Sequence, residues 1–315
     1  MTTEKQYPKT LFEAIRFFSD EDTAILFVAE IRWPDGVICP TCGRRDVSYL
    51  AKQRRWQCKS NHAHRQFSVK VGTIFEDSPI PLGKWMIALW MEANSKNAIS
   101  SYEVGRALGV TQKTAWFMLH RIRLALQNGS FTKLTGEVEV DETFIGGKAR
   151  NMHTGKRTAK GRGAVGKAVV MGLLQRHGEV RTKVVENTRR KTLQPHVRAN
   201  VEKGSHVYSD ALPSYEGLED EYVHEAVDHA ECYVKGRVHT NGLENFWSLF
   251  KRCIHGTHVS IEPFHLFRYL DSETFRFNNR KVNDGRRFVL GVGGISGKRL
   301  TYAELTGKVG GEATE

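Results

Sequence analysis

The strongest constraint on the fold comes from residues 136–148, GEVEVDETFIGGK, which combine the alternation of a strand with several acids. Successive side chains of a strand point to opposite faces. The valines therefore share one face, and Glu137, Glu139 and Asp141 share the other. An amphipathic strand with one solvated face explains this pattern without any chemistry. The acids found elsewhere in the chain favour a second interpretation, in which this strand contributes to a site for divalent cations.

Two later segments also carry an acid near one end. Residues 205–211, SHVYSDA, predict a strand that closes on Asp210, and residues 241–251 predict an amphipathic helix that carries Glu244. Carboxylate oxygens are the ligands that hard divalent cations prefer. Three carboxylates on two strand ends and one helix face therefore suit metal binding.

Glu244 also has a purely structural interpretation. Asn241 at the helix N-cap with Glu244 three positions later is the pattern of a capping box. Both roles are compatible, because a glutamate in the first turn can also face a metal. Lys251 follows Glu244 by seven residues, nearly two turns, and so lies on the same helix face, where it could bind a phosphate.

The charge of the chain points to a polyanionic partner. Over 315 residues, the 47 lysines and arginines exceed the 35 aspartates and glutamates by 12. Nucleic acid is the leading partner for such a basic chain, although membranes and acidic proteins also attract cations. The sequence has neither a run of 18 apolar residues nor a basic, apolar leader, so we expect a cytoplasmic protein without a membrane span.

The cysteines predict a zinc ribbon. Cys39 and Cys42 form a Cys-x2-Cys knuckle, and Cys58 follows after 15 intervening residues with His62 and His64 close behind. Three thiolates and an imidazole are the set that tetrahedral structural zinc prefers, and a disulfide is disfavoured in a reducing cytosol. Only one histidine is needed, so His62 is the first candidate and His64 the substitute.

Helical spacing dominates residues 81–127. Two helices separated by Gly109-Val110-Thr111, with Thr111 capping the second, have the pattern of a helix-turn-helix. On this interpretation Gln112 and Lys113 open the helix that faces the DNA major groove. Thr114 and Phe117 share that face, and the buried positions are Ala115, Trp116, Leu119 and Ile122. Many helical hairpins bind nothing, and the net charge of the chain favours DNA binding here.

Residues 146–167 form a glycine-rich basic segment that contains Lys156 and Arg157. Such a segment cannot bury enough apolar surface to fold alone, so we expect a basic loop. A solvated loop is the simple interpretation. Its place directly after the acidic strand favours a clamp on DNA phosphates, with Lys156 and Arg157 as DNA-binding residues.

The order of the remaining elements predicts an α/β fold. Residues 168–174 and 180–185 read as two strands of a meander, and a helix from about 191 to 201 leads into the strand of Asp210. Strand, strand, strand, helix, strand, helix is the order of an RNase H-like domain, in which the first and fourth strands lie side by side and bring Asp141 and Asp210 together. The predicted segments are N-terminal helices at 1–32 with Ser19 or Asp20 capping the second, a zinc ribbon at 33–78, a helix-turn-helix at 79–130, the RNase H-like domain at 135–282, and a loosely ordered tail at 283–315.

Five motifs in one order carry a family resemblance: CPTCG at 39–43, QFSVKVGTIFEDSP at 66–79, VEVDET at 138–143, YSD at 208–210 and HTNGLENFWSLFKR at 239–252. With them, the chain resembles the zinc-ribbon DDE transposases of bacterial insertion sequences, the group related to eukaryotic Merlin elements. The resemblance runs from about Trp33 to Arg280.

The resemblance implies strand cleavage and transfer at the terminal inverted repeats of an element, with Mg²⁺ or Mn²⁺ at the catalytic site. It places the catalytic acids at Asp141, Asp210 and Glu244, with Lys251 as the basic helper. Some relatives carry asparagine as the third catalytic residue, which leaves Asn241 and Asn245 as alternatives. It also implies a homodimer or larger assembly on double-stranded DNA, and hence a nucleoid-associated protein.

Two other classes of function compete with this one. A DNA-binding regulator would use the ribbon and the helix-turn-helix, but it has no use for carboxylates at all three positions. An RNase H-like nuclease would cut DNA without joining it, and the sequence separates it poorly from a transposase.

Overall fold

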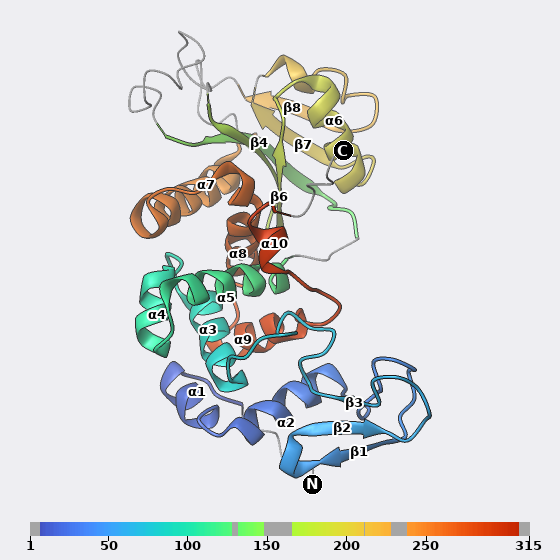
Figure 1. Cartoon of the computed structure of the whole chain (residues 1–315). Helices are drawn as coiled ribbons and strands as arrows, with labels where there is room; N and C mark the ends of the chain where they lie inside the picture. The colour runs from blue at the N-terminus through green and yellow to red at the C-terminus, as the bar shows by residue number, and fades with distance from the viewer. Residues whose placement is uncertain (1–6, 128–131, 148–165, 211, 228–237, 309–315) are drawn as a thin grey trace, which may run out of the picture. The chain divides into compact units, whose positions relative to one another are not determined.

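The computed structural model describes residues 7–127, 132–147, 166–210, 212–227 and 238–308 (Figure 1). The chain divides into two compact units. Unit 1 comprises residues 1–127 together with 279–315, and unit 2 comprises residues 128–278. No helix in the described ranges has both the length and the apolar character that crossing a membrane requires.

Unit 1 begins with two helices, α1 (Leu11–Phe17) and α2 (Glu21–Arg32). The Asp20 side chain accepts a hydrogen bond from the backbone N–H of Thr23 at 2.8 Å, which confirms the predicted pair of helices and places the cap at Asp20.

A three-stranded antiparallel sheet in the order β1-β2-β3 follows. Its strands are β1 (Val47–Leu50), β2 (Arg55–Cys58) and β3 (Gln66–Phe67), and the single turn η1 (Ala51–Gln53) joins the first two. Trp56 is buried and stacks on Phe67 with 6.3 Å between ring centroids. Such a small core is typical of segments whose folding free energy comes from a bound metal.

Three helices complete the first part of unit 1: α3 (Leu82–Asn94), α4 (Ser101–Leu108) and α5 (Gln112–Ala125). A capping box between Ser100 and Glu103 begins α4, and Gly109 ends it in the left-handed region at φ 60°. The Thr111 side chain caps α5. The predicted helical pair is therefore present, with Ala115, Leu119 and Ile122 buried and Trp116 half-buried.

The prediction of a loosely ordered tail after residue 283 was wrong. Residues 284–293 form α9 (Asp284–Gly293), and α10 (Tyr302–Leu305) follows. Phe288 of α9 is fully buried, with its ring 5.0 Å from that of Trp90 and 5.8 Å from that of Phe27. The glycines of this segment suggested disorder, whereas its apolar side chains complete the core of unit 1.

Unit 2 is built on a five-stranded sheet in the order β6-β5-β4-β7-β8. The antiparallel meander of β4 (Glu137–Ile145), β5 (Ala168–Gln175) and β6 (Val180–Val185) was predicted. The strand β7 (His206–Asp210) pairs in parallel with β4, which confirms that the first and fourth strands are neighbours. The sequence did not predict β8 (Val223–Val227), which pairs in parallel with β7. This order and these directions define an RNase H-like sheet.

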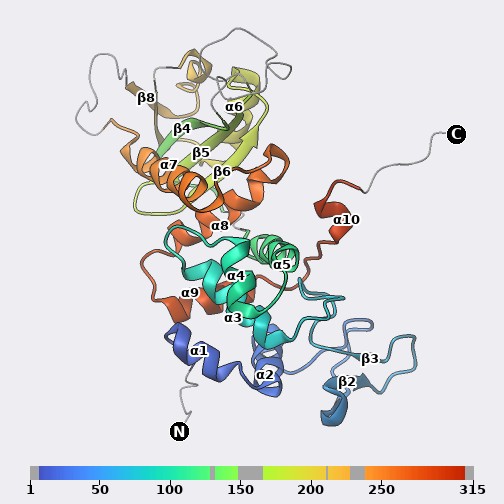
Figure 2. The same cartoon turned by 60° about the vertical axis from the view of Figure 1, so that its left-hand side comes forward.

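Helices cover both faces of this sheet (Figures 1 and 2). On one face, α6 (Arg190–Asn200) buries Leu193 and Val197 against Val138 and Val140 of β4. On the other face, α7 (Asn241–Cys253) and α8 (Leu266–Asn278) pack against β5 and β6. Short turns η4 (Pro213–Tyr215), η5 (Ile254–His258) and η6 (Pro263–His265) connect these elements, and η5 is a π-helical turn that continues α7.

Candidate active site and zinc centre

The register of β4 and β7 brings two of the predicted acids to one edge of the sheet. Val140 pairs with Ser209 in parallel, so Asp141 and Asp210 follow at neighbouring positions; β7 ends at Asp210, whereas β4 continues to Ile145 and does not end at Asp141 as the sequence predicted. The Asp141 carboxylate accepts a hydrogen bond from the indole N–H of Trp247 on α7 at 3.0 Å. This bond fixes the first acid against the helix that carries Glu244.

The acids influence one another electrostatically. Burial above all, together with the charge of Asp210 and more weakly that of Glu244, raises the pKa of Asp141 to about 7 against two opposing hydrogen bonds. Asp141 is thus within electrostatic reach of both other predicted acids.

Glu142 is a fourth acid that the sequence analysis did not select. Burial raises its pKa to about 8, with contributions from Asp141 and Asp210. Its Oε1 atom is buried and has no hydrogen-bond partner within the described ranges. Strand alternation places Glu142 on the same face as Val138 and Val140. This face was predicted to be apolar, so no sequence pattern identified Glu142 as a site residue.

This acidic edge fits divalent cations in the chemistry of its donors. Carboxylates that are buried together without a cation raise one another's pKa, and a bound cation would offset their charge. The carboxylates are less tightly gathered than the ribbon ligands, because only the latter, among the described residues, form a group of donor atoms within 4.8 Å of one another.

The start of α7 differs from the sequence expectation. The N-cap is Thr240, which makes no side-chain capping bond, so the capping box predicted for Asn241 and Glu244 is wrong. Instead, the Oε2 atom of Glu139 on β4 accepts a hydrogen bond from the backbone N–H of Leu243 at 3.0 Å. A tertiary contact replaces the local cap, and local sequence spacing could not reveal it.

Glu139 is therefore not part of a solvated face. Its side chain is buried, and its Oε1 atom accepts a hydrogen bond from Arg176 at 3.0 Å. Glu137 accepts one from the hydroxyl of Tyr208, also at 3.0 Å. The acids of β4 alternate as the sequence predicted. Glu137 and Glu139, however, form hydrogen bonds that hold the sheet and α7 in place.

Lys251, Asn241 and Asn245 are exposed on α7 in the positions that the helical spacing predicted, as is Glu244. Lys251 lies at the C-terminal end of the helix and lines a pocket with His255 of the following turn. The first turn of α7 thus carries an acid and its last turn carries bases.

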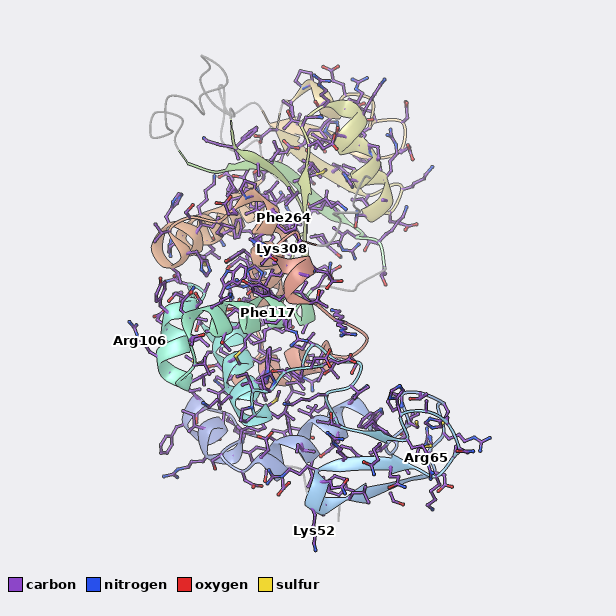
Figure 3. The ribbon with its side chains drawn as sticks, viewed as in Figure 1. Lys52, Arg65, Arg106, Phe117, Phe264 and Lys308 are labelled. Carbon is purple, nitrogen blue, oxygen red and sulfur yellow. The ribbon has the colours of Figure 1, made fainter. Side chains whose placement is uncertain are left out.

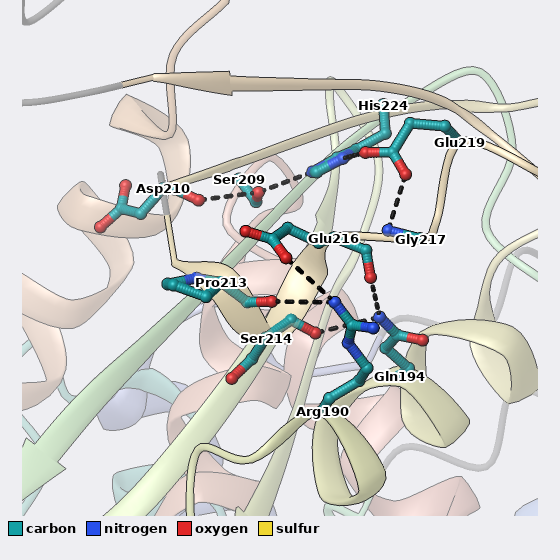
Figure 4. A network of polar contacts seen from close by, with 10 residues as sticks. All are labelled: Arg190, Gln194, Ser209, Asp210, Pro213, Ser214, Glu216, Gly217, Glu219 and His224. Carbon is teal, nitrogen blue, oxygen red and sulfur yellow. Dashed lines mark hydrogen bonds and ion pairs between the residues drawn. The ribbon is translucent and has the colours of Figure 1, made fainter.

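A polar network supports the end of β7 (Figure 4). The Ser209 hydroxyl donates to the Asp210 carbonyl oxygen at 3.0 Å and lies 2.8 Å from Nε2 of His224 on β8, whose Nδ1 donates to Glu219 at 2.9 Å. The hydrogen bond from His224 lowers the pKa of Glu219 to about 2. The Asp210 carboxylate points away from this network in Figure 4, so the network holds the backbone of the strand end and not the carboxylate.

The ribbon ligands are gathered as predicted. The donor atoms of Cys39, Cys42, Cys58 and His62 all lie within 4.8 Å of one another, whereas His64 is exposed and outside the group. Burial would raise the pKa of the Cys58 thiol, but hydrogen bonds from His62 and Ser60 outweigh it and lower the pKa to about 6. Three thiols and one imidazole in this arrangement suit tetrahedral zinc.

Gln112 and Lys113 lie exposed in the first turn of α5, as expected. The Gln112 amide donates to Ser101 of α4 at 2.8 Å, and the Lys113 ammonium lies 4.9 Å from the ring centroid of Tyr302 on α10. Figure 3 shows other basic side chains, Lys52 and Arg106, projecting from the turn after β1 and from α4. The predicted DNA contacts Lys156 and Arg157 lie outside the described residues, as does Cys232.

The RNase H-like sheet with neighbouring acids on its two central strands, together with the zinc ribbon, defines a DDE transposase. Residues 133–278 match the family model of the ISXO2-like transposase domain, and residues 19–64 match that of the transposase zinc-ribbon domain. The chain belongs to the ISXO2-like transposase family, which confirms the resemblance seen in the sequence.

Two relatives accord with this assignment. A protein of the transposable element ISH50 of Halobacterium salinarum is 30% identical over 274 residues, covering 81% of this chain and 90% of that protein. A transposase-like protein of Haemophilus influenzae is 33% identical over 105 residues, covering 33% of this chain and 85% of that protein. The alignment with the crystal structure of a pre-cleavage Mos1 transpososome covers 65% of this chain and 73% of that chain, at 14% sequence identity and a TM-score of 0.29. The fold assignment therefore rests on the sheet topology.

Proposed function

We propose that this transposase binds the terminal inverted repeats of an insertion sequence and carries out Mg²⁺-dependent strand cleavage and strand transfer. The observation that supports the chemistry best is the placement of Asp141 and Asp210 at neighbouring positions of the two central strands, with Glu244 near enough to raise the pKa of Asp141. A DNA-binding regulator would gain nothing from burying carboxyl groups together.

Asp141, Asp210 and Glu244 would hold the catalytic metal, with Mn²⁺ as a substitute for Mg²⁺. When bound in pairs, such ions stabilise both the attacking and the leaving oxygen of a phosphoryl transfer. Trp247 orients the Asp141 carboxylate through its indole N–H. Lys251, two turns further along α7, would bind a neighbouring phosphate of the DNA strand.

DNA binding would be shared between the basic surfaces of the chain. Gln112 and Lys113 stand where the second helix of a helix-turn-helix contacts base edges, and Lys156 and Arg157 would contact phosphates. Work on two DNA ends calls for a homodimer or larger assembly, which acts at the nucleoid in the cytoplasm. The zinc ion would be held by the four ribbon ligands in a structural role.

The test is cleavage of a duplex that contains an element end, with binding measured in parallel. Asp141→Asn, Asp210→Asn and Glu244→Gln each remove one charge at nearly constant size, so cleavage should fall by orders of magnitude while binding persists. Glu202→Gln is the matched control, because Glu202 is exposed and precedes β7, at the end of this strand opposite Asp210.

Cleavage at the wild-type rate by the two aspartate variants would refute the proposal. Normal cleavage by Glu244→Gln alone would move the third role to Asn241 or Asn245. Covalently joined product DNA separates a transposase from a simple nuclease, which releases cut ends only.

A further inference from the structure

After α9, residues 295–305 of unit 1 return to the helix α5. The backbone N–H of Gly297 donates to the Gly72 carbonyl oxygen at 2.9 Å. The ammonium of Lys298 donates to the Leu124 carbonyl oxygen at 3.0 Å, in the last turn of α5. The last four carbonyl groups of a helix have no partner within it, and a lysine can satisfy them. These bonds fix the start of the segment at the C-terminal end of α5.

From there the segment runs toward the first turn of α5. Arg299 pairs with Asp77 at 2.6 Å. The ring of Tyr302 on α10 makes an edge contact with the ring of Phe117, with 5.6 Å between centroids and 88° between planes. The Nζ atom of Lys113 lies 4.9 Å from the Tyr302 centroid. The contacts thus move from the last turn of α5 to its first turn as the chain advances.

A pocket of about 280 Å³ lies on the same face of α5. Three turns of α5, the helix α10 and the end of the motif at 66–79 line it, through Lys113, Phe117, Arg121, Tyr302 and residues 77–80. The α5 residues are spaced by four, so they share one helix face. The Arg121 guanidinium also donates to the Glu76 carbonyl oxygen at 2.5 Å. The end of this motif therefore packs on α5 beside α10.

The segment leaves the first turn of α5 open. Gln112 and Lys113 are exposed, and the ring of Tyr302 beside them is itself 38% exposed. A lid would bury the side chains that it blocks. A capping box begins α10 and Leu305 is buried, so the ring belongs to an ordered element. The segment therefore adds an aromatic ring to the surface on which these two side chains stand.

An aromatic ring restricts a lysine without neutralising it. The long side chain of a free lysine has many rotamers, and it loses this freedom when it binds. The face of a ring within about 6 Å attracts the ammonium. The Lys113 ammonium stays exposed beside the Tyr302 ring and keeps donors for a further partner. A contact whose side chain is ordered in advance gains affinity, because less entropy is lost on binding.

We propose that residues 298–305 are part of the surface that reads the element's ends, and that Tyr302 is a positioning residue that holds the Lys113 ammonium for base contacts. The edge of a guanine is the ligand that fits this ammonium, because it presents two acceptors in the major groove. The proposal rests on the proposed function, since it takes the first turn of α5 to contact bases.

The test measures binding of the full-length protein to a duplex with the terminal repeat and to a random duplex of equal length. One salt concentration is used without divalent metal, so the result does not depend on cleavage. Tyr302→Leu removes the ring and keeps an apolar side chain. The ratio of the two affinities should fall roughly 2- to 5-fold, which corresponds to one exposed cation–π contact. Tyr302→Phe keeps the ring face and should retain the wild-type ratio.

A double-mutant cycle connects the effect to Lys113. Lys113→Met removes the charge and should itself lower the ratio, and Tyr302→Leu added to it should cause no further loss. Phe12→Leu is the matched control, because the guanidinium carbon of Arg16 lies 4.2 Å from the ring centroid of Phe12 on α1. This variant removes a cation–π contact of unit 1 outside α5 and α10, and it should keep the wild-type ratio.

The inference is overturned when Tyr302→Leu keeps the wild-type ratio, or when it strengthens binding to both duplexes as the loss of a lid would. It is also overturned when Tyr302→Leu costs as much in the Lys113→Met protein as in the wild type. A loss in Lys113→Met without one in Tyr302→Leu leaves the proposed base contacts of α5 intact. An unchanged ratio in Lys113→Met would refute those contacts themselves, so the two failures are distinguishable.

Discussion

At the scale of single residues, the site is defined by carboxyl groups that retain protons. Asp141 and Glu142 are neighbours on β4, and burial raises their pKa values to about 7 and about 8. An unfolded chain would ionise both near pH 4, from their ordinary values of 3.8 and 4.5. Between about pH 4 and pH 8 the folded protein therefore binds more protons than the unfolded chain.

We predict that the metal-free protein loses stability as the pH rises from 4 to 8. The free energy of unfolding falls with pH wherever the folded state binds more protons, and this loss should be complete once both groups ionise near pH 8. Thermal unfolding at pH 5 and pH 8 measures it. Asp141→Asn and Glu142→Gln should each raise the melting temperature at pH 8 by a few degrees relative to wild type and leave it nearly unchanged at pH 4. A melting temperature of the variants that follows the wild type at every pH would contradict the assignment.

At the scale of elements, α7 is positioned by a strand rather than by its own sequence. Glu139 accepts from the Leu243 N–H, and Gly242 allows this close approach. A Cβ atom on Gly242 would lie 2.7 Å from the Glu139 carboxylate and 2.5 Å from Leu174. The glycine is required by packing and not by backbone conformation.

We predict that Gly242→Ala displaces the start of α7 and with it Glu244. Cleavage should fall at least tenfold, and the free energy of unfolding should fall by about 1–3 kcal/mol as overpacking usually requires. Gly256→Ala on η5 is the control, because a Cβ atom there would meet nothing within 4 Å. Rates and unfolding curves of the two variants provide the comparison, and equal behaviour would argue against a role for this contact.

The helix α5 permits a second prediction at this scale. Replacing Gln112 and Lys113 with alanine should weaken binding to terminal repeats more than binding to random duplex, because the first turn of such a helix reaches base edges. Titrations of both DNAs at one salt concentration measure the difference. Equal losses on both would mean that these side chains contact phosphates only.

Local sequence patterns predict some features of the site and miss others. The neighbouring positions of Asp141 and Asp210 followed from alternation and element order, although β4 does not end at Asp141, and the helix face of Glu244 and Lys251 followed from helical spacing. The roles of Glu139, Glu142 and His224 could not be predicted from local patterns. Each depends on a partner that is distant in the sequence or on a strand that the sequence did not predict. The strand β8 was missed because VHEAV has too few apolar residues to separate it from a loop.

At the scale of the whole molecule, each unit has its own source of stability. The ribbon of unit 1 has a small core, while unit 2 buries two apolar layers around its sheet.

We predict that Cys42→Ser removes about one zinc per chain and loosens residues 33–75, because metal binding supplies the folding free energy of such segments. Elemental analysis and hydrogen exchange measure the two effects. Full zinc retention would refute the ligand set, and faster exchange in β4 to β7 would show that the metal also supports unit 2.

The closure of unit 1 by α9 has a consequence for synthesis of the chain. Phe288 completes the aromatic core formed with Phe18, Phe27 and Trp90, yet the ribosome makes it only after the whole of unit 2. Domains generally fold as units during translation, so the middle of this chain can reach its native state before its beginning does. A nascent or truncated product that ends near residue 278 would then carry a folded RNase H-like sheet beside an incomplete unit 1, and limited proteolysis of such a fragment should cut within residues 7–127 first.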